Sequence, residues 1–203
     1  IVVNSGNANA FTGSRGKVSV QAITTKAAEV LNIPRSRVFS SSTGVIGEEL
    51  PHNLIIDALG KMVVEKTKHD ILEAAKAIMT TDTYPKGSVR KVLTDRGAIT
   101  IAGIAKGSGM IAPNMATMLV YLFTDASVKK EVLQYYLSEI NEITFNSISV
   151  DGDTSTSDTV LMAATGKSGI LIEKNDKNFL RGLTSLMTDL AHQVVKDGEG
   201  ASK

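Results

Sequence analysis

The chain has 203 residues, with 22 basic and 21 acidic side chains and a formal net charge of +1. This length suits one compact unit or two small lobes, and we expect one compact unit. The balanced charge, without blocks of like charge, argues against a nucleic-acid-binding or membrane-surface protein. The absence of cysteine excludes a disulfide scaffold, a thiolate zinc site and a cysteine nucleophile.

Histidine usage and hydropathy narrow the class further. His52, His69 and His192 are far apart and form no paired zinc motif, so we expect no metal site. No apolar run is long enough to cross a membrane and no signal peptide opens the chain, so we expect a cytoplasmic protein. The chain starts at Ile1 without a methionine and stops at Lys203, which suggests a part of a longer polypeptide or a processed product.

The first 80 residues combine a polar start with helical periodicity. Residues 4–10 are rich in Asn, Gly and Ser, which predicts an ordered loop. Apolar spacing predicts a helix over 18–31 that stops before Pro34. A short strand is expected at 38–42, and two amphipathic helices at 54–64 and 71–79.

The rest of the chain mixes strands with helices. Apolar runs predict strands, apolar residues every three or four positions predict helices, and the glycines at 107 and 109 predict a turn. The expected strands are 89–93, 98–104, 118–123 and 160–164, and the expected helices are 128–140 and 179–194. Strands and helices that do not strictly alternate indicate an α/β or α+β layered fold.

Three short motifs resemble ligand-binding signatures but lack part of each pattern. Gly107-x-Gly109-x-x-Ala112 mimics a dinucleotide fingerprint, yet Pro113 and Asn114 follow where a helix should begin. Residues 166–168 (Gly-Lys-Ser) end like a phosphate-binding loop without its first glycine, which favours a simple turn after a strand.

The third motif resembles a calcium loop. Residues 151–162 lack the glycine and the closing glutamate that such a loop needs. Asp151, Asp153 and Asp158 are therefore interpreted as turn formers and caps, near a functional site.

Residues 106–119 (Lys-Gly-Ser-Gly-Met-Ile-Ala-Pro-Asn-Met-Ala-Thr-Met-Leu) carry the functional argument. By itself Thr117 is a β-branched residue at the start of a buried strand. The segment nevertheless resembles the cleavage-site signature of the ornithine acetyltransferase (ArgJ-type) family. Further blocks resemble the family in the same order, at residues 4–10 (NSGNANA), 42–47 (STGVIG), 79–83 (MTTDT) and 197–200 (DGEG).

The resemblance implies a self-processing ArgJ/DmpA-like fold, with mixed sheets packed against helices. The precursor would cut itself between Ala116 and Thr117, leaving residues 1–116 as the α-chain portion and 117–203 as the start of a β chain. The new α-amine of Thr117 would have an ordinary pKa of about 7.7–8.0, so it could accept the proton of the hydroxyl nucleophile. Acetyl would then move from N2-acetyl-ornithine to glutamate through an ester on Thr117, releasing ornithine.

The resemblance also implies the groups around the nucleophile. Thr43 and Gly44 match the family's oxyanion hole, whose donors stabilise the tetrahedral intermediate. Lys106 matches a lysine that binds the substrate carboxylate, Glu199 a glutamate that faces its ammonium group, and Thr80 a polar substrate contact.

Some features depart from the family or stay open. Phe11 stands where the family often has cysteine, and the family's C-terminal part is absent after Lys203. No tightly bound cofactor is expected, acetyl-CoA is a candidate co-substrate, and the family suggests a dimer of α/β heterodimers. Two alternatives remain: a self-processing amidase or aminopeptidase with the same Thr117 nucleophile, and a non-catalytic dinucleotide-binding module that uses the turn at Gly107.

Overall fold

The computed structural model describes residues 1–65, 70–111 and 118–200. Contacts divide the chain into two compact units, Ile1–Thr80 and Thr81–Lys203, where the sequence predicted one. The boundary between the units therefore lies well before the expected cleavage site between residues 116 and 117. Division of the chain into two polypeptides at residue 117 stays a prediction.

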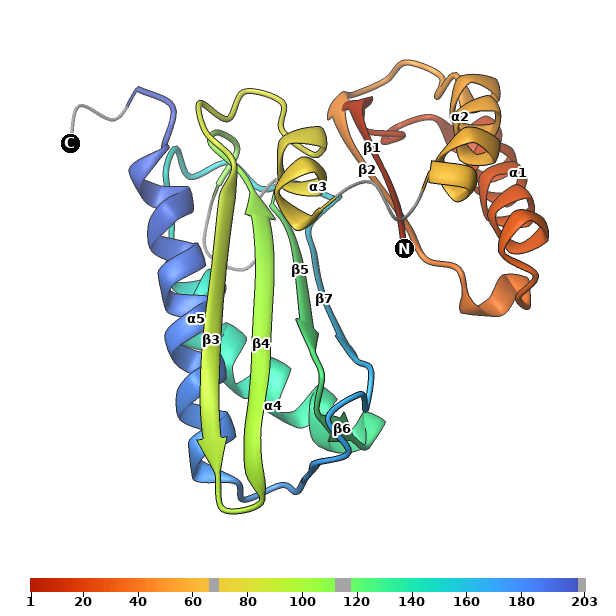
Figure 1. The fold of residues 1–203 in the computed structure, drawn as a ribbon. Helices are drawn as coiled ribbons and strands as arrows, with labels where there is room; N and C mark the ends of the chain where they lie inside the picture. The colour runs from red at the N-terminus through yellow and green to blue at the C-terminus, as the bar shows by residue number, and fades with distance from the viewer. Residues whose placement is uncertain (66–69, 112–117, 201–203) are drawn as a thin grey trace. The chain divides into compact units, whose positions relative to one another are not determined.

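The first unit is a two-stranded sheet with helices. Its elements are β1 (Val2–Asn7), α1 (Gly13–Leu31), the 3-10 helix η1 (Arg35–Arg37), β2 (Ser40–Val45), α2 (His52–Glu65) and α3 (Ile71–Ala77) (Figure 1). Strands β1 and β2 pair in parallel, from Val2 opposite Ser40 to Gly6 opposite Gly44. Helices α1 and α2 contact each other, and this unit buries a small apolar core of Ile23, Ala27, Leu50 and Leu59.

Local sequence sets the helix ends in this unit. Helix α1 ends where Asn32 adopts a left-handed conformation with φ of 52°, and its N–H bonds to the carbonyls of Ala28 and Glu29. Asparagine tolerates this conformation better than most residues, which makes it a suitable helix terminator. Helix α3 begins after Asp70, whose carboxylate accepts a 3.0 Å hydrogen bond from the Glu73 amide.

The second unit is built on a mixed sheet with strand order β3-β4-β5-β7. Pairing is antiparallel between β3 and β4 and between β4 and β5, and parallel between β5 and β7. The short strands β6 and β8 form a separate parallel pair. The elements are β3 (Lys86–Thr94), β4 (Gly97–Lys106), β5 (Leu119–Thr124), β6 (Ser127–Val128), α4 (Lys130–Glu142), the 3-10 helix η2 (Phe145–Ser147), β7 (Thr159–Ala164), β8 (Leu171–Ile172) and α5 (Lys177–Lys196).

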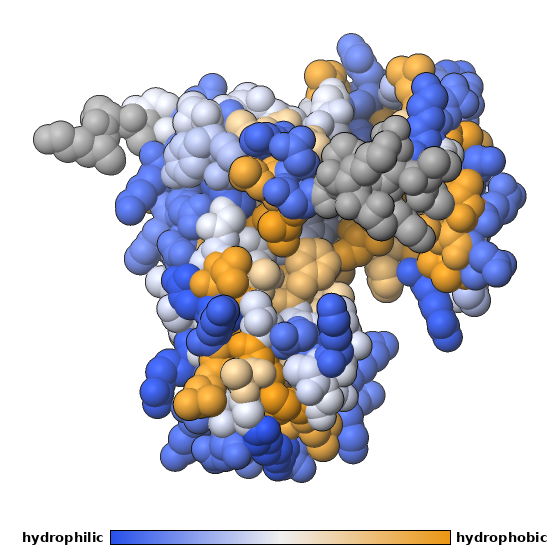
Figure 2. Space-filling view, viewed as in Figure 1, coloured by the Kyte–Doolittle hydropathy of each residue, from blue (hydrophilic) through white to orange (hydrophobic). Residues whose placement is uncertain are grey.

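Helix α5 lies along β3 and β4, with α4 on the same face of the sheet (Figure 1). Its apolar residues at helical spacing are fully buried and join inward-facing residues of the strands in one core. The main members of this core are Ile99, Ile101, Val120, Leu122, Tyr136, Ile140, Phe179, Leu183, Leu186, Met187, Leu190 and Val194. On β3 the alternate positions Val89 and Leu93 are 56% and 75% exposed. Apolar side chains accordingly interrupt the polar surface in the space-filling view (Figure 2).

The layered α/β architecture predicted from the sequence is confirmed, with small shifts at the element ends. The loop predicted at residues 4–10 is wrong for residues 4–7, which belong to β1, whereas residues 8–10 lie outside regular secondary structure. Hydrogen bonding to β2 outweighs the poor strand propensity of Asn, Ser and Gly here. Val128, assigned to a helix by its spacing, instead lies in β6, and both two-residue strands escaped prediction because they are too short to show periodicity.

Candidate active site

One edge of the four-stranded sheet gathers polar groups from segments far apart in the sequence. Lys86 begins β3, Lys106 ends β4, Leu119 begins β5 and Thr159 begins β7. The register places Lys106 opposite Leu119, Leu119 opposite Thr159, and Lys86 opposite Ala105. These strand ends form one row, called the site edge below.

A buried ion cluster holds the site edge to the end of α5. The Lys86 Nζ lies 2.7 Å from Asp82 Oδ1 and 2.5 Å from Asp197 Oδ2, and none of the three side chains is more than 2% exposed. The amide of Thr83 donates a 2.9 Å hydrogen bond to Asp197, and the Thr83 hydroxyl donates a second. Burial works to raise the pKa of Asp197, but the hydrogen bonds from Lys86 and Thr83 outweigh it and hold that pKa below its ordinary value.

Lys106, the expected substrate-binding lysine, is buried at the site edge. Its side chain is 2% exposed, and its Nζ lies 3.9 Å from Asp82 Oδ2. The Gly107 amide donates a 2.7 Å hydrogen bond to the other oxygen of the same carboxylate. Burial lowers the pKa of Lys106, partly offset by Asp82. An ammonium group held in this way out of water is suited to bind an anionic group strongly, since electrostatic attraction grows as the dielectric falls.

The glycine turn after β4 contacts the residues that follow α5. Ser108 donates its hydroxyl to the Asp197 carbonyl at 2.7 Å, and its own carbonyl accepts the Glu199 amide at 2.7 Å. The Glu199 carboxylate lies so close to Gly109 that a Cβ there would be 2.5 Å from Oε2. A larger residue at position 109 would require the Glu199 side chain to shift. The predicted site residues Lys106 and Glu199 therefore flank the same turn.

Asp151 and Asp158 accept hydrogen bonds from backbone amides in the described parts of the predicted cleavage segment, residues 106–119. Asp151 accepts the amides of Met110 at 2.5 Å and Ile111 at 2.8 Å. Asp158 accepts the amide of Met118 at 2.9 Å. The interpretation of these aspartates as caps of backbone amides is confirmed. Which amides they cap could not be predicted from the sequence, because the contacts span 40 residues or more.

Asp158 differs from Asp151 in the hydrogen bonding of its second carboxylate oxygen. The Oδ2 atom is buried and has no hydrogen-bond partner among the described residues. Burial raises the pKa of Asp158 to about 7, with the Met118 amide and Lys106 opposing the shift. Asp158 and Met118 line a cavity of about 230 Å³, together with α4 side chains that include Ser138 and Asn141.

The predicted oxyanion residues lie in the first unit, on β2. Thr43 is 1% exposed and sits opposite Ser5 of β1. Gly44 has a φ of 130°, and a Cβ at this position would overlap the backbone of Gly6. Glycine is therefore required both by its conformation and by the close approach of β1.

The remaining predicted residues fall into two groups. Thr80 is exposed, at the end of the first unit and three residues beyond the end of α3. Ala116 and Thr117, the expected cleavage residues and nucleophile, lie outside the described residues. Met118, bonded to Thr117, is the first described residue after them.

The buried charges around Lys106 were not predicted as site residues. Asp82 and Asp197 stand inside family-like blocks, which was the only sequence signal for them, and Lys86 had none. No helix begins among residues 107–111. Within the described ranges, no helix is long and apolar enough to span a membrane, and no three acidic or histidine side chains are grouped to hold a metal ion.

Known proteins are similar to this sequence throughout its length. The model of the ArgJ family matches residues 1–203. Arginine biosynthesis bifunctional proteins ArgJ are similar: that of Ruegeria pomeroyi is 55% identical over 203 residues, covering all of this chain and 50% of the relative. That of Brucella suis is 48% identical over 211 residues, covering all of this chain and 51% of the relative. The chain thus spans about half the length of the curated relatives it matches.

A solved structure supports the same assignment. The crystal structure of the arginine biosynthesis bifunctional protein ArgJ from Bacillus halodurans aligns with a TM-score of 0.50 and 37% sequence identity. The alignment covers 58% of this chain and 60% of that one. The family resemblance and the α/β fold are both confirmed, and the chain belongs to the ArgJ family.

Proposed function

We propose that the whole protein containing this chain is a self-processing N-acetyltransferase of arginine biosynthesis, which moves acetyl from N2-acetyl-ornithine to glutamate. The observation that carries the proposal is the site edge. Three features lie on neighbouring parts of this edge: the buried Lys106, the glycine turn that contacts Glu199, and Met118, the residue bonded to Thr117. Names of the similar proteins place them in arginine biosynthesis.

The proposed reaction begins with Thr117. Cleavage after Ala116 frees an α-amine that is substantially neutral near physiological pH and can accept the hydroxyl proton. The hydroxyl oxygen attacks the acetyl carbonyl of acetyl-ornithine, and ornithine leaves as its amine takes up the proton. Glutamate then attacks the acetyl ester in the second half-reaction and regenerates the free hydroxyl.

The other residues bind the substrate or stabilise the charge that develops. The Thr43 hydroxyl and the Gly44 amide donate to the tetrahedral oxyanion, and loss of one such donor costs about 2.7–4 kcal/mol of barrier. Lys106 binds the α-carboxylate, Glu199 faces an ammonium group, and Thr80 adds a polar contact. The same small-molecule site serves both half-reactions, because both substrates are amino acids.

Wider features of the proposal follow from the family resemblance. We extend it to acetyl-CoA as a second acetyl donor, to action in the cytoplasm, and to an assembly of two α/β heterodimers. Residues beyond Lys203 would complete the substrate pocket, since the relatives are about twice as long.

The test has two parts. Intact-mass measurement of the full-length protein should show two chains that meet between Ala116 and Thr117, while Thr117→Ala stays a single chain. Acetyl-ornithine and glutamate should then give acetylglutamate. Formation of free acetate in place of acetylglutamate would instead identify a hydrolase with the same nucleophile.

A further inference from the structure

A buried carboxylate to which the proposed function gives no role contacts the end of β4. Asp82 lies on the segment before β3, and its side chain is fully buried. Its Oδ1 accepts hydrogen bonds from Lys86 Nζ and from the Gly107 amide, both at 2.7 Å. Its Oδ2 faces Lys106 Nζ at 3.9 Å. One carboxylate therefore contacts the lysine that begins β3, the expected substrate-binding lysine and the glycine that follows it.

The buried ion cluster with Lys106 added is balanced in charge. Lys86 and Lys106 are its two cations, and Asp82 and Asp197 are its two anions. Each of the four side chains is at most 2% exposed. The Asp197 carboxylate lies 2.5 Å from Lys86, so its charge is paired with that lysine. Within the cluster, Asp82 is thus the carboxylate that compensates the charge of Lys106.

The charged groups that face Lys106 act on its ammonium group in opposite directions. Burial lowers the pKa of Lys106, and Asp82 opposes this most strongly. Lys86 of β3 adds to the lowering, and Asp158, which precedes β7, raises the pKa least. Asp158 is also an incomplete anion at neutral pH, because burial raises its own pKa to about 7. Among the described residues, Asp82 is therefore the main group that keeps this buried lysine protonated.

We propose that Asp82 is a positioning residue for substrate binding, which holds Lys106 charged and fixes the turn after it so that the ammonium group meets the substrate carboxylate. This inference rests on the proposed function, in which Lys106 binds that carboxylate. A purely structural Asp82 would only tie the start of β3 to the end of β4, through Lys86 and Gly107. The two roles differ in how the loss of the negative charge at residue 82 affects the recognition of substrate.

Asp82→Asn separates the two roles, because asparagine keeps a carbonyl oxygen for its hydrogen-bond donors but removes the charge. The experiment measures kcat/KM for N2-acetyl-ornithine across pH, with full-length protein that intact mass shows to be cut. An opposite charge at this distance shifts a pKa by about 1–3 units, so Lys106 should lose its proton at lower pH in the variant. The alkaline fall of kcat/KM should therefore begin about 1–3 pH units below that of the wild-type protein.

A donor without the carboxylate tests whether the effect passes through Lys106. N2-acetyl-ornithinamide carries a neutral carboxamide in place of the carboxylate and gains little from a charged lysine. At alkaline pH, Asp82→Asn should lose about 10-fold or more in kcat/KM on N2-acetyl-ornithine, since each unit of pKa shift is a factor of ten. On the amide it should remain close to the wild-type protein. A general disturbance of the fold would instead lower both values alike.

Two further variants separate charge from packing. Asp125→Asn is a matched control, since Asp125 likewise accepts a backbone amide, that of Thr100 at 2.8 Å. It should keep the wild-type pH profile. Asp82→Glu keeps the charge in a longer side chain, so its alkaline fall should stay at the wild-type pH even if kcat/KM is lower throughout. If Asp82→Asn does not fold or is not cut, Asp82→Glu decides, and an alkaline fall displaced as far as predicted for Asp82→Asn would refute the role of the charge.

The outcomes distinguish this inference from the proposed function. If the wild-type protein forms acetylglutamate and Asp82→Asn has the wild-type pH profile, or loses the same activity on both donors, the positioning role is refuted while the proposed function stands. If the wild-type protein forms no acetylglutamate, both are refuted.

Discussion

Replacement of Lys86 by methionine should destabilise the protein more than any exposed charge substitution. Methionine has a similar length and fits the buried space, but it cannot donate to a carboxylate. The variant would leave Asp82 and Asp197 buried side by side without their shared cation, and would also remove the ammonium group that lies 4.9 Å from the Tyr84 ring centroid.

The expected magnitude follows from the burial of all three groups. Lys86 and Asp82 are fully buried and Asp197 is 2% exposed, at distances of 2.7 and 2.5 Å. Removal of one partner from such a buried ion pair costs about 3–5 kcal/mol of unfolding free energy. We expect a loss in this range at pH 7.

The cost should depend on pH in a defined direction. In the wild-type protein the pKa of Asp197 is held low, so its contribution to stability is present above its ordinary pKa and is lost as pH falls through the lowered value. In Lys86→Met the two carboxylates repel each other and gain by protonation. The stability difference between variant and wild type should therefore shrink as pH falls from 7 to 4.

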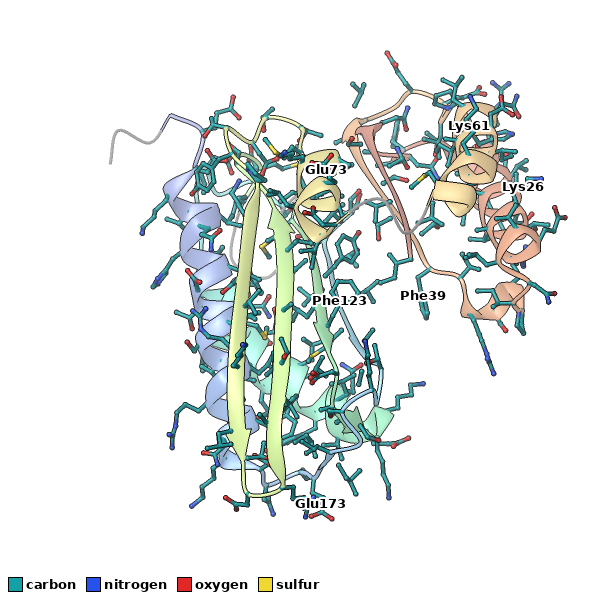
Figure 3. All side chains as sticks on the ribbon, in the orientation of Figure 1. Lys26, Phe39, Lys61, Glu73, Phe123 and Glu173 are labelled. Atoms are coloured by element: carbon teal, nitrogen blue, oxygen red, sulfur yellow. The ribbon has the colours of Figure 1, made fainter. Side chains whose placement is uncertain are left out.

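Urea unfolding followed by far-UV circular dichroism measures this difference. Arg96→Met is a suitable control, because the Arg96–Glu173 pair, at 2.6 Å, is exposed and lies by the turn between β3 and β4, at the other end of the sheet (Figure 3). It should cost far less than Lys86→Met. A Lys86→Met variant as stable as Arg96→Met at pH 7, or a cost that does not change with pH, would refute the reasoning.

Three further predictions concern other residues of the candidate site. Asp158→Asn should be more stable than wild type at pH 8 by about 2 kcal/mol, which is half of the full value for a pKa shift from 3.8 to about 7 because the side chain is partly exposed. This gain in stability should vanish near pH 4, since a raised pKa penalises only the ionised form of the carboxyl. Urea unfolding at both pH values checks the prediction, and equal stability of variant and wild type at pH 8 would contradict it. Gly44→Ala should lower the thermal unfolding temperature more than Gly47→Ala, because a Cβ at residue 44 overlaps Gly6 whereas residue 47, with φ of 89°, has open space around it. Lys106→Met should lower kcat/KM for acetyl transfer by about 10- to 100-fold, the usual cost of losing a hydrogen bond to a charged group; steady-state kinetics test this, and an unchanged kcat/KM would remove Lys106 from the substrate site.

The sequence predicted those parts of the fold that have a local cause. Helix α5 is evident because Phe179, Leu183, Leu186, Leu190 and Val194 recur at helical spacing and are fully buried. Strand β1 could not be predicted, because its pairing with β2, more than 30 residues away in the sequence, overrides an unfavourable local composition.

The candidate site was predictable in the same partial way. Lys106 and Glu199 were identified through family resemblance, and the structure places both beside the turn at Gly107–Gly109. The cluster of Lys86 with Asp197 joins residues 111 positions apart, so no local pattern announces it. The buried Asp158 oxygen that has no hydrogen-bond partner among the described residues is likewise a product of tertiary packing.

The most direct test of the account is the intact mass of the full-length protein together with the sequence of any new N-terminus. The account predicts two chains, with Thr117 as the first residue of the second, and a single chain for Thr117→Ala. A wild-type protein that remains one active chain, or a cut at any other position, would contradict the proposal that Thr117 gains its base by cleavage.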